Sequence, residues 1–172
     1  MTLATTLIGF EAIKLIMEHS SEFRFDPRSV IFAGGSAGGH LASCAALAIN
    51  REHHNTRPLG TILFNPPLNI VSKPHLMAEF GNDLQRFSPY QAMTEEFPAT
   101  LIFHGTADRR VSYHSIEQFV ARGVELGIDI ELVGFEGKGH AFFNYGKDGN
   151  KPYRRTLEKM ERFLSRLPEM IA

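Results

Sequence analysis

Residues 30–42 read Val-Ile-Phe-Ala-Gly-Gly-Ser-Ala-Gly-Gly-His-Leu-Ala, and this stretch decides the fold. The apolar run Val30–Ala33 is typical of a buried strand, and the Ala- and Leu-rich run 40–49 is typical of a helix. A tight glycine-rich turn joins them and fits the pattern G-x-S-x-G around Ser36. A strand that leads through such a turn directly into a helix predicts an α/β fold.

Strands and helices alternate along the rest of the chain. Apolar runs predict further strands at 61–64, 99–104 and 128–135. Helices are expected at 3–19, at 112–126 with Ser112 as N-cap and Gly127 as stop, and from Pro152 onward. In the first helix we expect one buried apolar face, formed by Leu3, Leu7, Ile8, Ala12, Leu15 and Ile16.

Short, continuously apolar strands separated by helices indicate a mostly parallel sheet flanked by helices on both faces. Functional groups in such a fold lie at the carboxyl ends of the strands. That rule singles out three segments of this chain: 34–39, 106–111 and 137–143.

Composition narrows the class of protein. The 172 residues fit a single domain, 1–172, and the net charge of −1 gives no basic surface for nucleic acid. Cys44 is the only cysteine, so neither an intramolecular disulfide nor a cysteine-based zinc site can form. No run is long enough to span a membrane, and the N-terminus does not read as a signal peptide, so we expect a cytoplasmic protein.

Ser36 is the candidate nucleophile. A turn this sharp holds the serine in a strained backbone conformation and leaves no room for side chains at Gly34 and Gly38. The N–H of Ala37, in the turn that leads into the following helix, is the expected oxyanion donor, with Gly35 beside it at the substrate. A phosphate-binding loop is the alternative, but the spacing is not G-x-G-x-x-G and no Lys-Ser/Thr pair follows.

Asp108 and His140 are the candidate acid and base. A serine hydroxyl needs an adjacent base, normally a histidine oriented by a carboxylate, in the chain order serine, acid, histidine. Both residues follow a predicted strand in that order; alone, they would read as a turn aspartate and a loop histidine. We expect packing or supporting roles for His40 and His104, and no metal site, because no metal-ligand spacing occurs.

Three segments resemble one known family. Segment 34–42 (GGSAGGHLA) resembles the nucleophile elbow of α/β-hydrolases of the esterase and lipase kind, including hormone-sensitive-lipase-like esterases and carbohydrate acetyl esterases. Segment 104–111 (HGTADRRV) looks like their acid loop and segment 139–143 (GHAFF) like their histidine loop. The resemblance implies hydrolysis of carboxylic esters through an acyl-enzyme, without a cofactor.

The chain departs from that family at its start. In the family several strands and a His-Gly-Gly-type loop precede the helix that corresponds to 3–19, so we expect a truncated α/β-hydrolase fold that lacks the N-terminal strands. The nucleophile strand then becomes an edge of the sheet, and an exposed apolar edge tends to pair with another chain. We therefore expect a homodimer, or a partner chain that covers Val30–Ala33.

Three functions remain open on the sequence. The first is hydrolysis of short-acyl esters, with acetylated carbohydrates as one candidate class; the second is a serine peptidase of the prolyl-oligopeptidase type; the third is a non-catalytic half. Segment 68–97 occupies the position of a cap or lid. Leu68, Met77 and Phe80 are candidates to line the pocket, and Phe142 to wall it.

Overall fold

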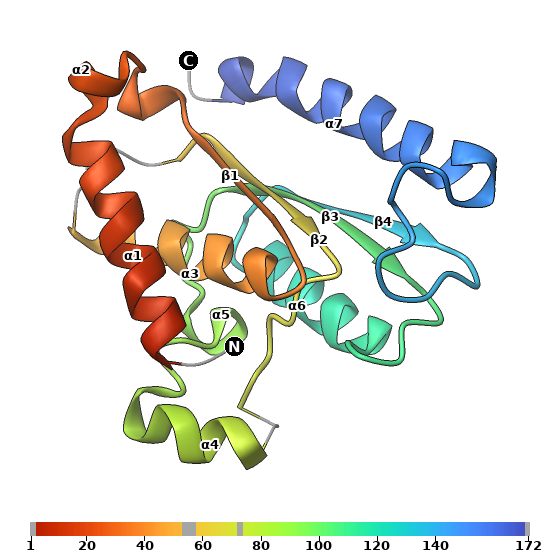
Figure 1. Ribbon diagram of the computed structural model, residues 1–172, viewed down its shortest axis with the longest axis horizontal. Helices are drawn as coiled ribbons and strands as arrows, with labels where there is room; N and C mark the ends of the chain where they lie inside the picture. Colours follow the sequence, from red (N-terminus) through yellow and green to blue (C-terminus); the bar gives the residue numbers. More distant parts are fainter. Residues whose placement is uncertain (1–2, 53–57, 72–73, 171–172) are drawn as a thin grey trace.

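A four-stranded sheet forms the centre of the protein. The computed structural model describes residues 3–52, 58–71 and 74–170. The strands are β1 (Ile31–Gly35), β2 (Gly60–Phe64), β3 (Ala99–Gly105) and β4 (Ile130–Phe135). All three strand pairs are parallel, and the spatial order β1-β2-β3-β4 is the order of the sequence. The predicted α/β fold with a parallel sheet is confirmed (Figure 1).

Helices cover both faces of this sheet. α3 (Ala37–Glu52) and α6 (Tyr113–Glu125) lie on one face, and α7 (Lys151–Met170) lies on the other (Figure 1). α1 (Leu3–Glu18) packs on α3 rather than on the sheet itself. Shorter helical segments join these elements: α2 (Ser20–Phe23), α4 (Pro74–Phe80), α5 (Pro89–Ala92) and 3-10 turns at Pro27–Ser29, Gly81–Asp83 and Asp148–Asn150.

The two covered faces explain the continuous apolar runs of the inner strands. Successive side chains of a strand point to opposite faces, so a strand buried on both sides has no polar alternation. In β2, Leu63 joins the core under α3 and α6, whereas Ile62 joins the core under α7. In β3, Ile102 joins the core under α3 and α6, and Leu101 joins the core under α7.

The outer strand β1 is an edge of this sheet. It pairs with β2 on one side, and within the described part of the chain no strand pairs with its other side. The expectation of an edge strand is confirmed. The expectation of a buried strand is only partly right, because Phe32 is buried but Ile31 is half-buried and Ala33 is exposed.

The predicted buried face of α1 is wrong. Most of the expected apolar face is exposed: Leu7 and Leu15 keep 46% and 55% of their surface, and Ile8 keeps 70%. The helix instead turns Thr6, Phe10 and other residues toward its neighbours. Because α1 is apolar around most of its circumference, the sequence pattern does not determine which side faces the core.

Segment 68–97 has a small core of its own. Ile70, Leu76, Phe80, Leu84 and Phe87 pack together, with Leu3 and Phe10 of α1 against them. Of the three candidate pocket residues here, Leu68 and Phe80 are buried in cores, whereas Met77 is exposed. A cap role for this segment, and a single-domain organisation of the chain, stay predictions. No helix among the described residues has the length and apolar character to cross a membrane.

Candidate active site

The turn between β1 and α3 holds Ser36 in a left-handed backbone conformation, with φ of +54°. Its N–H donates to the carbonyl of Phe64 at 2.8 Å, which ties the turn to the end of β2. A Cβ on Gly34 would lie 2.3 Å from the carbonyl oxygen of Gly38, so Gly34 has to be glycine. A non-glycine residue with positive φ at a functional turn marks strain that the surrounding structure maintains.

The steric requirement at Gly38 is absent, which corrects the sequence prediction. A Cβ on Gly38 would meet no described atom within 4 Å outside its own helix backbone and chain neighbours. The crowded position is Gly39, where a Cβ would lie 3.0 Å from both the Gly34 carbonyl oxygen and Pro66. The backbone of Gly34 thus lies close to the backbone of Gly38 and Gly39, and the positions that require glycine are 34 and 39 rather than 34 and 38.

The N-terminus of α3 begins at the residue after the serine. Ala37 is the first residue of the helix, and the N–H of His40 donates to the carbonyl of Ser36 at 3.2 Å. The first N–H groups of a helix have no partner within it, and the helix dipole favours negative charge at that end. The predicted oxyanion donor, the N–H of Ala37, thus lies at the positive end of a 16-residue helix.

Ser36, His140 and Asp108 lie within hydrogen-bonding distance in series. Nε2 of His140 is 3.0 Å from Oγ of Ser36, and Nδ1 of His140 is 2.7 Å from Oδ2 of Asp108. The three residues follow β1, β4 and β3, so the carboxyl edge of the sheet brings together residues up to 104 positions apart. The structure joins the three side chains that the sequence singled out.

The Asp108 carboxylate is buried and held by three donors. Its side chain is fully buried, and its Oδ1 accepts from the backbone N–H groups of Arg110 at 2.8 Å and Val111 at 3.1 Å. Burial alone would raise the pKa of this carboxyl. The hydrogen bonds from His140, Val111 and Arg110 outweigh burial and lower the pKa below its ordinary value. Asp108 is therefore a charged acceptor for Nδ1–H of His140.

The loop that carries Asp108 and the loop that carries His140 lie close together. The N–H of Ala107 donates to the carbonyl of Lys138 at 3.0 Å. A Cβ on Gly105 would lie 2.2 Å from that same carbonyl oxygen, so the residue that ends β3 has to be glycine. A backbone hydrogen bond thus joins the loops that carry Asp108 and His140, in addition to the contact between their side chains.

Two other histidines are buried near the site but do not join it as bases. Nε2–H of His104 donates to the carbonyl of Val111 at 3.0 Å and lies 3.5 Å from Oδ2 of Asp108. Burial lowers the pKa of His104, so this ring stays neutral beside the carboxylate. His40 donates to the carbonyl of Phe87 at 2.7 Å, and burial lowers its pKa to about 4. The expected packing roles of both rings are confirmed.

Of the two other residues expected to contact the substrate, Gly35 lies beside Ser36 and Phe142 lies in the core. Gly35 ends β1 directly before Ser36. Phe142, the expected pocket wall, lies in the core instead, 4% exposed, with its ring 4.4 Å from that of Phe135. Phe143 is the aromatic residue near the nucleophile turn, because its ring edge would lie 3.6 Å from a Cβ on Gly35. The sequence offered no signal to separate these two adjacent phenylalanines.

Asn65 is a polar residue of the site that the sequence motifs do not single out. It follows β2, its φ is +39°, and it is 1% exposed. Its amide contacts the His140 ring and the backbone of the same loop. The rule that functional residues follow the strands could have found this position, since β2 lies between the strands that precede Ser36 and Asp108.

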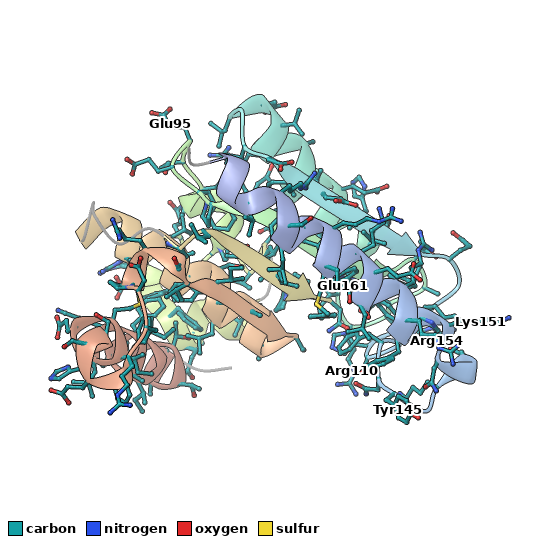
Figure 2. The ribbon with its side chains drawn as sticks, turned by 90° about the horizontal axis from the view of Figure 1, so that it is seen from above. Glu95, Arg110, Tyr145, Lys151, Arg154 and Glu161 are labelled. Atoms are coloured by element: carbon teal, nitrogen blue, oxygen red, sulfur yellow. The ribbon has the colours of Figure 1, made fainter. Side chains whose placement is uncertain are left out.

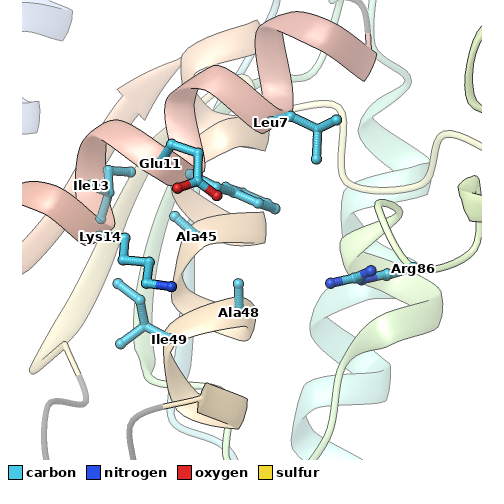
Figure 3. A pocket seen from close by; sticks show the side chains of 9 residues that line it. Leu7, Glu11, Ile13, Lys14, Ala45, Ala48, Ile49 and Arg86 are labelled. Atoms are coloured by element: carbon cyan, nitrogen blue, oxygen red, sulfur yellow. The ribbon is translucent and has the colours of Figure 1, made fainter.

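Two cavities lie at different places in the fold. A cavity of about 510 Å³ borders the acid loop and includes Asp108, Arg109, Arg110 and Tyr113 in its wall. Figure 2 shows Arg110 and Tyr145 at the end of the molecule where the loops after β3 and β4 lie, with Glu95 at the opposite end. A smaller cavity of about 110 Å³ lies between α1, α3 and Arg86 (Figure 3). Its wall contains none of Ser36, Asp108 and His140, so it is separate from the candidate active site.

Two family models match consecutive parts of the chain. A model of the alpha/beta hydrolase fold matches residues 7–83, the part that holds Ser36 and Asn65. A model of the prolyl oligopeptidase family matches residues 75–167, the part that holds Asp108 and His140.

Solved structures of an esterase share the architecture. Esterase 2 of Thermogutta terrifontis phosphoramylated by tabun is 34% identical with a TM-score of 0.82, and the match covers 94% of this chain and 64% of that one. The butyrate-bound form is 33% identical with a TM-score of 0.82, over 94% of this chain and 65% of that one.

A probable isoprenylcysteine alpha-carbonyl methylesterase of Arabidopsis thaliana is 22% identical over an alignment of 161 residues, and the match covers 74% of this chain and 33% of the relative. The chain thus spans less than two thirds of these relatives' lengths. Family models that together run from residue 7 to residue 167, and esterases with the same sheet, show that the chain belongs to the α/β-hydrolase fold family, of which it spans a part.

Proposed function

We propose that this chain carries the nucleophile, base and acid of a carboxylic ester hydrolase that works through a serine acyl-enzyme. The observation that supports this proposal best is the series of contacts from Ser36 Oγ to His140 Nε2 at 3.0 Å and from His140 Nδ1 to Asp108 Oδ2 at 2.7 Å. Such a series is recognised by its geometry and by the role of each group rather than by sequence position.

The proposed reaction has two halves. Oγ of Ser36 attacks the ester carbonyl carbon while its proton moves to Nε2 of His140, and the N–H of Ala37 stabilises the oxyanion. The bond to the alcohol breaks, and the same proton passes from Nε2 to the alcohol oxygen. Water then attacks the acyl-enzyme in the same manner, which releases the carboxylic acid and restores Ser36.

Short acyl groups are the proposed substrate class. The similar esterase of Thermogutta terrifontis has been solved with butyrate and with propionate bound, both small carboxylates. Acetylated carbohydrates are a subclass with the same small acyl group. Neither the cavity beside Asp108 nor the family matches select among alcohols.

A chain-length series of chromogenic esters tests the proposal, with a Ser36→Ala variant as control. We expect acetate and butyrate esters to be hydrolysed faster than long-chain esters, and the variant to lose activity by at least about 10³-fold, because the nucleophile is removed. Equal rates for the two proteins would rule out Ser36 as the nucleophile.

A peptidase of the prolyl-oligopeptidase type is the second candidate, favoured by the family match over residues 75–167. A panel of proline-containing peptides alongside the ester series separates the two activities.

A fluorophosphonate probe tests whether the chain is a non-catalytic half. The similar esterase is described as phosphonylated by sarin, so failure to label Ser36 here would favour an inactive site.

A further inference from the structure

Asn65 lies between the loops of the proposed nucleophile and the proposed acid. It is the first residue after β2, and its N–H donates to the carbonyl of Phe103 in β3 at 2.8 Å. Its side chain is buried, and its φ of +39° places the residue in the left-handed region. Asparagine tolerates that region better than most residues, so the position suits this side chain.

The backbone of the histidine loop fixes the orientation of the Asn65 amide. The N–H of Ala141 lies 3.1 Å from Oδ1 of Asn65, and a backbone N–H can only donate. The oxygen of the amide must therefore face Ala141. The NH₂ group then faces the ring of His140, with Nδ2 of Asn65 3.1 Å from Nε2. The opposite orientation would place two donors against each other.

The His140 ring offers a single lone pair to two donors. Because Nδ1–H is donated to the Asp108 carboxylate, Nε2 of the neutral ring carries no proton. That nitrogen lies 3.0 Å from Oγ of Ser36 and 3.1 Å from Nδ2 of Asn65. The hydroxyl and the amide share one acceptor, and only the hydroxyl has a proton to give up.

We propose that Asn65 is a positioning residue for the base: its amide bridges Nε2 of His140 and the N–H of Ala141, and so holds the unprotonated Nε2 toward Ser36. This inference rests on the proposed hydrolase function and deepens it. When the proton of Ser36 reaches Nε2, the amide loses its acceptor and faces an N–H. The contact then favours delivery of that proton to the leaving alcohol.

Substitution of Asn65 removes none of the other ionisable groups near His140. Asp108 contacts Nδ1, and the neutral His104 lies behind that carboxylate. Lys147 donates from Nζ to the carbonyl of Ala141 at 3.2 Å. A shift in pH dependence on substitution of Asn65 therefore reports the contact at Nε2.

Two variants of Asn65 test the proposal. Asn65→Asp keeps an acceptor for Ala141 but replaces the donor at Nε2 with a carboxylate oxygen, which stabilises the protonated ring. We expect kcat near neutral pH to fall by about 10²-fold with KM little changed, and the acid limb of the rate–pH curve to move to higher pH. Asn65→Leu removes both contacts, and we expect a lower kcat with a smaller movement of the acid limb in the same direction, because the donor that stabilises the neutral ring is lost.

A spectroscopic readout keeps this test independent of turnover. Ring ¹⁵N spectra of His140 at slightly alkaline pH should show an unprotonated Nε2 in the wild type and a protonated Nε2 in Asn65→Asp. An unchanged ring spectrum together with an unshifted rate–pH curve would overturn the positioning role. A wild type that hydrolyses no ester while its ring spectrum behaves as expected would instead refute the proposed function alone.

Discussion

Three residues at the candidate active site share a backbone conformation that is costly without glycine. Ser36, Asn65 and Ala141 have φ of +54°, +39° and +58°. Each N–H has an acceptor from a different strand or loop: Phe64, Phe103 and the Asn65 side chain. Non-glycine residues in this region cost about 1–3 kcal/mol each and persist where the surroundings hold them. The strained residues thus lie around the contact between the side chains of Ser36 and His140.

Substitutions at Gly34 and Gly38 should have opposite consequences. Gly34→Ala forces a Cβ to within 2.3 Å of the Gly38 carbonyl, so we expect the free energy of unfolding to fall by about 1–3 kcal/mol. Gly38→Ala meets open space at the start of α3 and should keep or slightly raise stability. Urea denaturation of both variants measures the difference, and equal losses would contradict the geometry of the turn.

At the scale of elements, the sequence predicts the sheet well and the short helices poorly. The predicted strand 99–104 matches β3, which runs to Gly105, and 112–126 matches α6 with its stop at Gly127, where φ is +75°. Buried strands have strong apolar signals because both faces pack. α2, α4 and α5 are too short for a helical period to register. α4 packs through the core around Phe80 and α5 buries Ala92, so tertiary packing stabilises these two helices, whereas α2 has no buried residue.

The start of α3 shows that sequence patterns predict the ends of elements less accurately than the elements themselves. The sequence predicts a helix over 40–49, whereas α3 begins at Ala37, directly after Ser36. Gly38 and Gly39 have low helix propensity and conceal this first turn. Of the candidate site, strand ends and chain order predict Ser36, Asp108 and His140, but the role of Asn65 depends on a side-chain orientation that no spacing encodes.

α3 also makes stability depend on acidity through His40. Its pKa is lowered from 6.5 to about 4 by burial, so below pH 6.5 the unfolded chain binds a proton that the folded chain does not. Stability is full above about pH 6.5 and declines as the pH falls toward 4. Across these roughly two and a half pH units the free energy of unfolding should fall by roughly 3 kcal/mol, at about 1.4 kcal/mol per unit.

Urea denaturation across that pH range, with His40→Gln as the matched variant, tests this expectation. Glutamine can donate to the Phe87 carbonyl without titrating, so the variant should lose less stability on acidification. His104 and Asp108, whose pKa values are also lowered, remain in both proteins. Identical pH dependence in the two proteins would assign the effect to groups other than His40.

At the scale of the whole molecule, β1 and α1 lie on the same side of the protein, away from β4 (Figure 1). Within residues 3–52, 58–71 and 74–170 no strand pairs with the outer side of β1, where Ala33 is exposed, and α1 exposes Ile8 and Leu15. An open strand edge with apolar surface nearby favours association. We propose a homodimer, or a partner chain, that covers Val30–Ala33.

Light scattering over a range of protein concentrations tests this association. We expect the mass to exceed that of one 19.3 kDa chain and to fall on dilution. Ala33→Lys, which adds a charge to the exposed edge, should shift the protein toward the monomer while its circular dichroism spectrum is unchanged. A monomer at every concentration, or a variant that associates as the wild type does, would contradict the proposal.

The sheet order β1-β2-β3-β4 has a consequence for synthesis on the ribosome. β2, β3 and β4 each pair with the strand made just before them, so these pairs can form in the order in which the chain emerges. Ser36 follows β1, whereas its proposed base is made 104 residues later and follows β4. A nascent chain stalled before residue 140 holds the serine without the imidazole, so its hydroxyl stays unreactive until that histidine has been made.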